Sequence, residues 1–196
     1  MIKVLDLITL LQASSLKNLP IKNSHAVITM FINQALAELY RKFNLSIKST
    51  VVTISKYKHI YTLNEPDVNM ILGVYDSEGN LIKSSNNTES TKMSYKLINY
   101  NSFTLNNCED DQVVCVYSAG CDKVGIDDEI AIPPGLQGAL LMYVGYLANM
   151  SINIDDTREA DAYRQRYEYL AQVLIAEGYK VELFTESSVV KDGGYV

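Results

Sequence analysis

Histidine and cysteine are scarce in this 196-residue chain, which contains two histidines and three cysteines. A Ser-His-Asp or Cys-His arrangement would have to use His25 or His59, and neither lies in a recognisable catalytic context. Cys108, Cys115 and Cys121 follow a C-x6-C-x5-C spacing, which fits none of the C-x2-C zinc patterns. The ten glycines are scattered and form no phosphate-binding loop. We therefore expect no catalytic residues, no metal and no cofactor.

Long apolar runs are also missing, and none approaches the roughly 18–20 residues needed to cross a bilayer. Asp6 interrupts the first apolar stretch, where a signal peptide would need an uninterrupted apolar core. The 47% hydrophobic content and the 14 tyrosines argue against disorder. We expect synthesis in the cytoplasm, no membrane partner, and one ordinary domain with an insertion.

The formal net charge of −6 is unevenly distributed along the chain. Residues 1–60 contain eight bases and two acids, whereas the remaining 136 residues contain nine bases and 21 acids. Such a division is typical of a nucleic-acid-binding arm or of a subunit that stacks on a partner of opposite charge. It is equally compatible with acids and bases that lie on different solvated faces of one fold.

Helical periodicity occurs at both ends of the chain. Apolar residues spaced by three and four predict helices over residues 2–13 and 24–44, the second capped by Asn23 or Ser24. A third helix over residues 135–152 has almost no polar face and must be buried on all sides. A fourth begins at a capping-box pattern, Asp156 to Glu159, and runs to Glu177, with Gly178 placed to terminate it.

The middle of the chain has the two-residue periodicity of β-strands. Strands are predicted at residues 47–55, 59–63, 70–76, 81–83, 93–100, 102–105 and 112–118, with a hairpin turn at 77–80. The predicted fold class is α+β. An antiparallel helix bundle is built from 1–44 and 130–178, the inserted antiparallel β domain (a sandwich or small barrel) spans 45–129, and 179–196 form a C-terminal arm.

Three segments resemble one protein family. Residues 132–153 (IPPGLQGALLMYVGYLANMSIN) are similar to a helix of tailed-phage head-to-tail adaptor proteins, which are also called connector or tail tubular ring proteins. Residues 31–43 (FINQALAELYRKF), followed by strands and IYTL at 60–63, resemble the N-terminal half of that family, and ADAYRQRYEY at 160–169 resembles its second Ala- and Tyr-rich helix. Asn64 stands where proline is usual and Gly145 where alanine is usual.

The resemblance implies a structural virion protein at the head-tail junction. Such adaptors form rings, commonly twelvefold, that bind the portal protein, extend the DNA channel and provide the docking surface for the next tail or ring protein. A ring needs two complementary patches on each subunit. We expect the apolar third helix to supply one of them through Leu141, Met142, Tyr146 and Met150.

Two further expectations depend on the ring interpretation. A channel for double-stranded DNA should have an acidic or neutral wall, because bases would bind the phosphates. The candidate channel-facing acids are Glu109, Asp110, Asp111, Asp127, Asp128 and Glu129, which are equally suitable as loop solubilisers. The C-terminal arm, with Val189, Val190, Tyr195 and Val196, is too polar to fold alone and is predicted to dock on the portal.

Two other classes of function remain open from the sequence. A cell-wall glycan hydrolase would use a carboxylate pair such as Asp155 and Glu159 or Asp127 and Glu129 as acid and base. A small DNA-binding module would use the bases of residues 1–60, such as Arg41, Lys42, Lys56 and Lys58, although these lack the motif of a groove-entering element.

Overall fold

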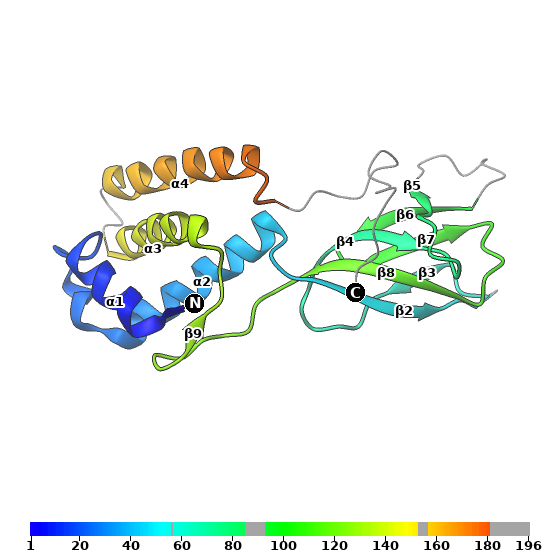
Figure 1. Cartoon of the computed structure of the whole chain (residues 1–196), viewed down its shortest axis with the longest axis horizontal. Coiled ribbons are helices and arrows are strands. Elements are labelled where there is room, and N and C mark those ends of the chain that lie inside the picture. Colours follow the sequence, from blue (N-terminus) through cyan, green and yellow to red (C-terminus); the bar gives the residue numbers. More distant parts are fainter. Residues whose placement is uncertain (56, 85–92, 153–156, 181–196) are drawn as a thin grey trace. The chain divides into compact units, whose positions relative to one another are not determined.

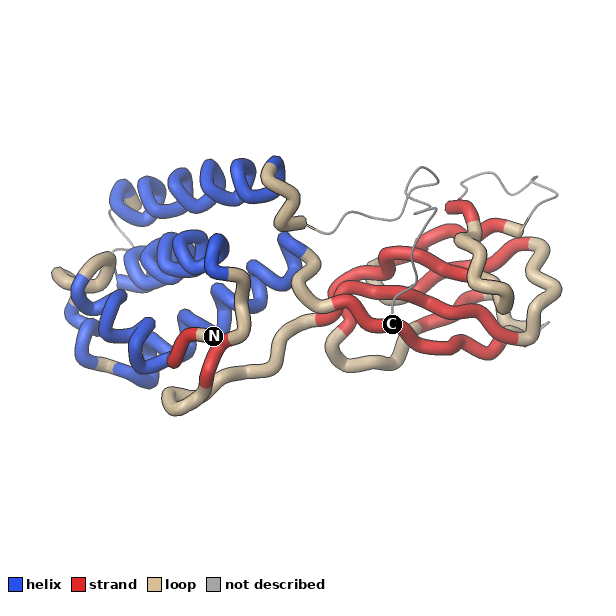
Figure 2. The backbone as a smooth tube through the Cα atoms, in the orientation of Figure 1, coloured by secondary structure: helices blue, strands red, loops and turns tan. Residues whose placement is uncertain are grey.

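The computed structural model describes residues 1–55, 57–84, 93–152 and 157–180 (Figure 1). These residues form a mixed α+β protein with four α-helices and sheets that are almost entirely antiparallel. They divide into two compact units, one made of residues 1–45 and 121–180 and the other of residues 46–120. Figure 2 shows that the first unit contains the helices and the second contains all strands except the short β1 and β9. We call them the helical unit and the β unit.

The helices of the helical unit lie where the sequence predicts them, within one or two residues. Their bounds are α1 Val4–Ala13, α2 His25–Phe43, α3 Gln137–Ile152 and α4 Arg158–Ala176, with the 3-10 turns Pro20–Asn23 and Pro134–Leu136 before α2 and α3. The predicted first helix is shorter at its start, because Ile2–Lys3 form strand β1. This strand pairs antiparallel with β9, Glu129–Ile130.

The helix ends confirm part of the predicted capping. Gly178 adopts a φ of 85° after α4, the backbone N–H of Tyr179 donates to the Leu174 oxygen and that of Gly178 to the Ile175 oxygen. This is the Schellman arrangement that glycine favours. At the start of α2, Ser24 occupies the cap position but its side chain makes no capping hydrogen bond. The predicted cap at Asp156 lies outside the described residues.

Helix α3 is the centre of the helical unit. It packs against α2 on one side and α4 on the other, and Figure 1 shows it between them. Ala139, Leu140, Val144 and Ala148 are fully buried, and the neighbouring Leu141 and Leu147 pack against the same core. The chain's own helices therefore cover most of the apolar surface that the sequence pattern assigns to this helix.

The β unit consists of two sheets. The three-stranded sheet has the order β2 (Ile47–Thr53), β8 (Gln112–Ala119), β4 (Val68–Tyr75), and the four-stranded sheet has the order β3 (Ile60–Thr62), β7 (Ser102–Asn106), β6 (Ser94–Asn99), β5 (Lys83–Ser84). Only the two-residue β5 pairs parallel to its neighbour. These positions confirm the predicted strands to within a few residues.

Both sheets contribute side chains to one hydrophobic core. Val113 and Cys115 of β8 pack in the same cluster as Tyr61 of β3 and Phe103 of β7, and all four are buried. The rings of Tyr61 and Phe103 lie 5.8 Å apart. In β8 the alternate residues Val113, Cys115 and Tyr117 face this core, as the period of two requires.

The predicted hairpin turn at residues 77–80 is also present. Gly79 has a φ of 85°, which favours glycine, and the Asp76 carboxylate accepts the backbone N–H groups of Glu78 and Asn80.

Residues 121–129 belong to the helical unit, although the sequence division placed them in the β domain. Three contacts explain the difference. The Asn33 side chain of α2 donates to the Val124 oxygen and accepts the Val124 N–H, the Val4 N–H donates to the Asp128 oxygen, and β9 pairs with β1. The boundary therefore follows Gly120, about ten residues earlier than predicted.

Gly145 allows α3 and α4 to approach closely. A Cβ atom at this position would lie 2.8 Å from Tyr163 and 3.2 Å from Ser15. We predict that Gly145→Ala lowers the free energy of unfolding by about 1–3 kcal/mol, because the Tyr163 ring would have to move. Chemical denaturation measures this change.

Gly138→Ala is the matched control in the same helix. Its Cβ would meet only the end of the Leu170 side chain, at 3.3 Å. Alanine also favours the helix by up to about 1 kcal/mol, so this variant should be as stable as the wild type or more so. Equal losses in the two variants would contradict the close-approach explanation.

Candidate functional site

Two of the segments that carry the family resemblance meet at Tyr167. This tyrosine of α4 is completely buried, and its hydroxyl donates a hydrogen bond to Glu38 Oε1 of α2 at 3.4 Å. The other oxygen of Glu38 accepts from the Arg41 guanidinium at 2.7 Å. A buried hydroxyl needs a hydrogen-bond partner, so the residues of 31–43 and 160–169 are joined in one packed network.

Lys42 lies over the same tyrosine. Its ammonium is 4.7 Å from the centre of the Tyr167 ring and 2.5 Å from the Glu168 carboxylate. Burial raises the pKa of Tyr167 far above its usual value, and the nearby carboxylates of Glu38 and Glu168 raise it further. The phenol is therefore held neutral, as a donor to Glu38 rather than as a titrating group.

Aromatic contacts extend this network along α3. The Tyr143 ring lies 4.7 Å from that of Tyr167 and 5.5 Å from that of Tyr146, and the Arg164 guanidinium is 5.9 Å from the Tyr146 ring. Tyr146, one of the predicted interface residues, is thus already partly covered within its own chain.

The other predicted interface residues are covered to different extents. Leu141 and Met142 pack against the core of the helical unit, and only Met150 is exposed, at 39%. The structure brings the four residues together on α3 but leaves little of their surface for a neighbour.

A groove lies on the outer face of α2. It has a volume of about 570 Å³, and its lining includes Ala26, Met30 and Ala37 from the helix and Cys121 and Lys123 from the following segment. The segment that contains Cys121 and Lys123 forms the second wall of this groove. Asn33 holds the segment against α2, because its side chain makes two hydrogen bonds, 2.8 and 2.9 Å long, with the backbone of Val124.

Sequence reasoning did not assign a role to Asn33. The sequence contains one indication of a role: Asn33 is an amide residue within the family-like segment 31–43 of an amphipathic helix. In the structure its side chain is half-buried.

The candidate channel-facing acids fall into two groups in different units. Glu109, Asp110 and Asp111 lie in the β7–β8 connection, whereas Asp127, Asp128 and Glu129 lie in the helical unit. Asp110 accepts the Ser77 N–H at 3.1 Å and Asp128 accepts the Gly125 N–H at 2.6 Å. The Asp128 carboxylate thus stabilises the turn that contains it, and the Asp110 carboxylate joins the β7–β8 connection to the hairpin turn at residues 77–80.

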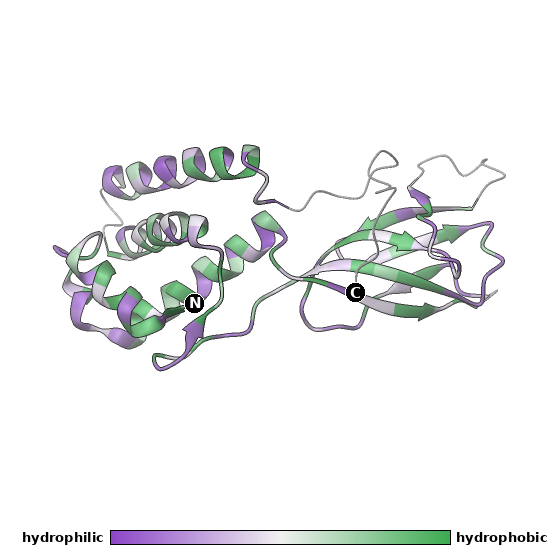
Figure 3. Ribbon diagram, in the orientation of Figure 1, coloured by the Kyte–Doolittle hydropathy of each residue, from purple (hydrophilic) through white to green (hydrophobic). Residues whose placement is uncertain are grey.

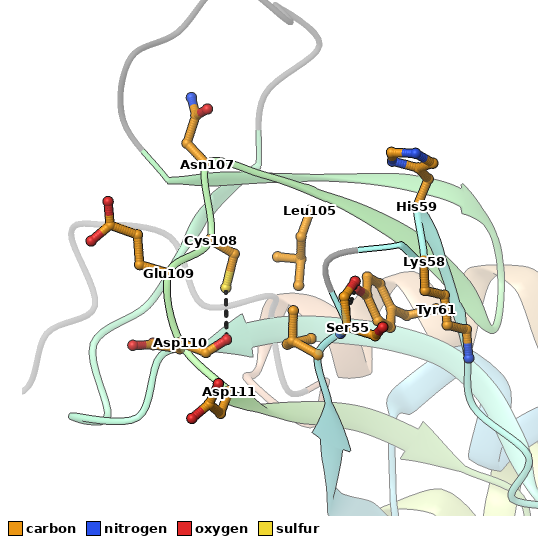
Figure 4. Close-up of a pocket in the computed structure, with 11 residues that line it drawn as sticks. Ser55, Lys58, His59, Tyr61, Leu105, Asn107, Cys108, Glu109, Asp110 and Asp111 are labelled. Carbon is orange, nitrogen blue, oxygen red and sulfur yellow. Dashed lines mark hydrogen bonds between the residues drawn. The ribbon is translucent and has the colours of Figure 1, made fainter.

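A second cavity of about 540 Å³ lies between the β2–β3 and β7–β8 connections (Figure 4). Lys58, His59, Cys108 and the three neighbouring acids line it, but the Cys108 sulfur is directed at the Asp110 backbone oxygen, 3.8 Å away. Burial raises the pKa of Cys108 above its usual value. An activated cysteine nucleophile needs a lowered pKa. The cavity therefore contains residue types that are common in catalytic sites, but its thiol is not activated.

The charge difference along the sequence does not separate the two units. Residues 1–45 and 121–180 contain ten bases and twelve acids, and residues 46–120 contain six bases and eight acids. Several of the N-terminal bases are also paired. Arg41 binds Glu38, Lys42 binds Glu168, and Lys48 binds Asp67 at 2.6 Å.

The remaining candidates give little further evidence. Asp155, Asp156, Lys56 and the arm residues Val189, Val190, Tyr195 and Val196 lie outside the described residues, and Glu159 lies exposed in the first turn of α4. Within the described ranges, no three His, Cys, Asp or Glu side chains are grouped in a way that could hold a metal ion. None of the helices described is long and apolar enough to cross a membrane.

Neither a scan against protein-family models nor a search of curated proteins found a match.

The Tyr167 network has a testable effect on stability. Tyr167→Phe removes the hydrogen bond to Glu38, and we predict a loss of about 1–3 kcal/mol in the free energy of unfolding at neutral pH. Because folding raises the pKa of Tyr167, the stabilisation is complete below the usual tyrosine value near 10 and is lost at higher pH. The advantage of the wild type over the variant should therefore shrink above about pH 10.

Chemical denaturation at neutral and alkaline pH measures both effects. Tyr169→Phe on the same helix is the control, since Tyr169 is exposed and should give wild-type stability at each pH. A constant difference between wild type and Tyr167→Phe across this pH range would contradict the assignment.

Proposed function

We propose that this chain is a structural virion protein of the head-to-tail adaptor type. Copies of it would form a ring, commonly twelvefold in the proteins that it resembles, that attaches to the portal at the head-tail junction. The ring would extend the channel for double-stranded DNA and provide the docking surface for the next tail or ring protein. The proposed architecture is an antiparallel helix bundle with an inserted β sandwich.

One observation supports this proposal more than any other. The residues that resemble the adaptor family lie far apart in the sequence, yet Glu38 of the first segment and Tyr167 of the last are hydrogen-bonded in the helical unit. Helix α3, which contains most of residues 132–153, packs against both α2 and α4, and Tyr143 contacts Tyr167. The resemblance thus concerns a connected core rather than three unrelated matches.

Gly145, which departs from the family pattern, fits the same core. The alanine that is usual in the family would place a Cβ against the Tyr163 ring. In this chain the Tyr163 ring occupies the space that the alanine methyl group would fill.

A structural role is also favoured over catalysis. A general acid and base need two carboxylates in a cleft with different environments, whereas Asp127, Glu129 and Glu159 are all exposed. The cavity that contains Cys108 holds a thiol whose pKa is raised rather than lowered. We therefore propose that the chain is not an enzyme and requires no cofactor.

Mass measurement tests the assembly. We predict that the full chain, mixed with the portal protein of the same virus, forms a complex that contains many copies of the chain per portal ring. Native mass spectrometry gives the copy number. The proposal is wrong if the chain stays monomeric in this mixture and leaves the portal free.

Truncation tests the C-terminal arm. A chain that ends after Phe184 lacks Val189, Val190, Tyr195 and Val196, and we predict that its affinity for the portal falls while its thermal stability remains that of the full chain. Binding of immobilised portal by the two chains measures the difference. Equal affinities would remove the arm from the portal contact without affecting the ring proposal.

A further inference from the structure

We infer that strand β2 is a docking edge for a second copy of this chain, and that two copies pair their β2 strands antiparallel about a twofold axis through Thr50. The contact would join two three-stranded sheets into one sheet of six strands. It is separate from the proposed ring, because a twofold pair uses the same surface on both copies, whereas neighbours in a ring contact each other through unlike surfaces.

The main-chain groups of β2 alternate in direction. The Ala119 N–H donates to the Ser46 oxygen at 2.8 Å, at one end of the β2–β8 pair. At the other end the Ile54 N–H donates to the Asp111 oxygen, also at 2.8 Å, and the register between the two bonds is regular. In an antiparallel pair, hydrogen-bonded residues alternate with residues whose main-chain groups point away. The even residues of β2 therefore bind β8, and the odd residues direct their N–H and C=O groups away from it: Ile47, Ser49, Val51 and Thr53.

This edge of the three-stranded sheet is open. No other strand of the described residues pairs with it, and all four odd residues are exposed, Val51 by 59%. The opposite edge, β4, is bound by its own chain at two points. The Ile71 N–H donates to the Tyr100 oxygen, and the Ile82 N–H donates to the Val74 oxygen. At two groups on each of four residues, eight main-chain groups of β2 thus lack a partner within the described part of the chain.

Strand β2 also lacks three features that usually prevent pairing at an exposed edge, namely prolines, bulges and unpaired charges. It contains no proline, and its seven residues pair with β8 without a register shift. Its one charged side chain, Lys48, binds the Asp67 carboxylate at 2.6 Å. A β-branched edge without these protections is a template for another strand.

A second β2 strand complements this edge because each odd residue carries both a donor and an acceptor. When the twofold axis passes through Thr50, Ile47 faces the partner's Thr53, and Ser49 faces the partner's Val51. Each such pair exchanges two hydrogen bonds, so the eight groups of both copies are all satisfied. It is the only symmetric register of β2 that satisfies all of them.

The side chains are compatible in the same register. Thr50 faces the partner's Thr50, and Lys48 faces the partner's Val52, so no two like charges lie opposite each other. Val51 lies beside Val114 of β8, and Figure 3 shows hydrophobic residues in both strands. The pair would therefore continue this apolar face from one copy to the other. A second copy of the chain is thus the occupant that matches both the main-chain groups and the side chains of the edge.

Disulfide trapping tests the register. Ile47 and the partner's Thr53 would form a hydrogen-bonded pair with Cα atoms about 5.5 Å apart, which a disulfide can span. Two full-length variants, Ile47→Cys and Thr53→Cys, are made in a Cys108→Ser, Cys121→Ser background with different mass tags and then mixed. We predict that mild oxidation gives the mixed dimer. Cys115 can remain, because it is fully buried and burial raises its pKa to about 12.

Each variant oxidised alone is the matched control. Identical positions lie six residues apart along the proposed pair, which is about 20 Å, so neither variant should form more than background dimer. A mixed dimer well above this background supports the register. A mixed dimer no more abundant than the dimers of the single variants overturns it.

Charge substitution tests the same register without a cross-link. Ser49→Lys combined with Val51→Lys places two pairs of like charges opposite each other, and self-association should weaken about tenfold or more. Ser49→Lys combined with Val51→Glu places opposite charges there and should retain or strengthen it. Sedimentation over a range of concentrations measures both, and thermal denaturation checks that both variants are folded, as expected for two exposed positions.

Two results of these measurements overturn the inference. One is an equal dissociation constant for the two double variants, and the other is a wild-type chain that is monomeric at every concentration. Hydrogen exchange then identifies the other occupant. Slow exchange of the odd β2 amides in a monomeric chain would assign the edge to residues 181–196 of the same chain.

Discussion

The hydroxyl of Tyr167 imposes a constraint on the whole helical unit. A phenol that is completely buried must donate its hydrogen bond, and the partner here is Glu38 of another helix. That bond fixes the register of α4 against α2, while Arg41 and Lys42 balance the two carboxylates that the bond brings close to the core. Helix α3 then fills the remaining space, and the ring of its Tyr143 contacts the Tyr167 ring at a tilt of 58°.

This arrangement has a consequence for assembly. Helix α3, which contains no charged residue, is enclosed by its own chain, so it leaves little apolar surface for a neighbour. Gly145 contributes to this enclosure by letting Tyr163 approach the α3 backbone. An apolar pattern alone cannot distinguish burial within a chain from burial between chains, because both remove the same side chains from water.

The sequence predicted the elements well and their long-range relations poorly. Helix ends such as Gly178, and the turn at Gly79, depend on local conformational preferences that a single residue type reveals. The domain boundary was missed because it depends on Asn33 reaching Val124, a contact across 91 positions. In the sequence, Glu38 is an ordinary acid of one helix and Tyr167 a tyrosine on the apolar face of another. Only the fold brings the two side chains within hydrogen-bonding distance. The charge difference between the two ends of the chain had no structural counterpart, since folding combines residues 1–45 with the more acidic segment 121–180.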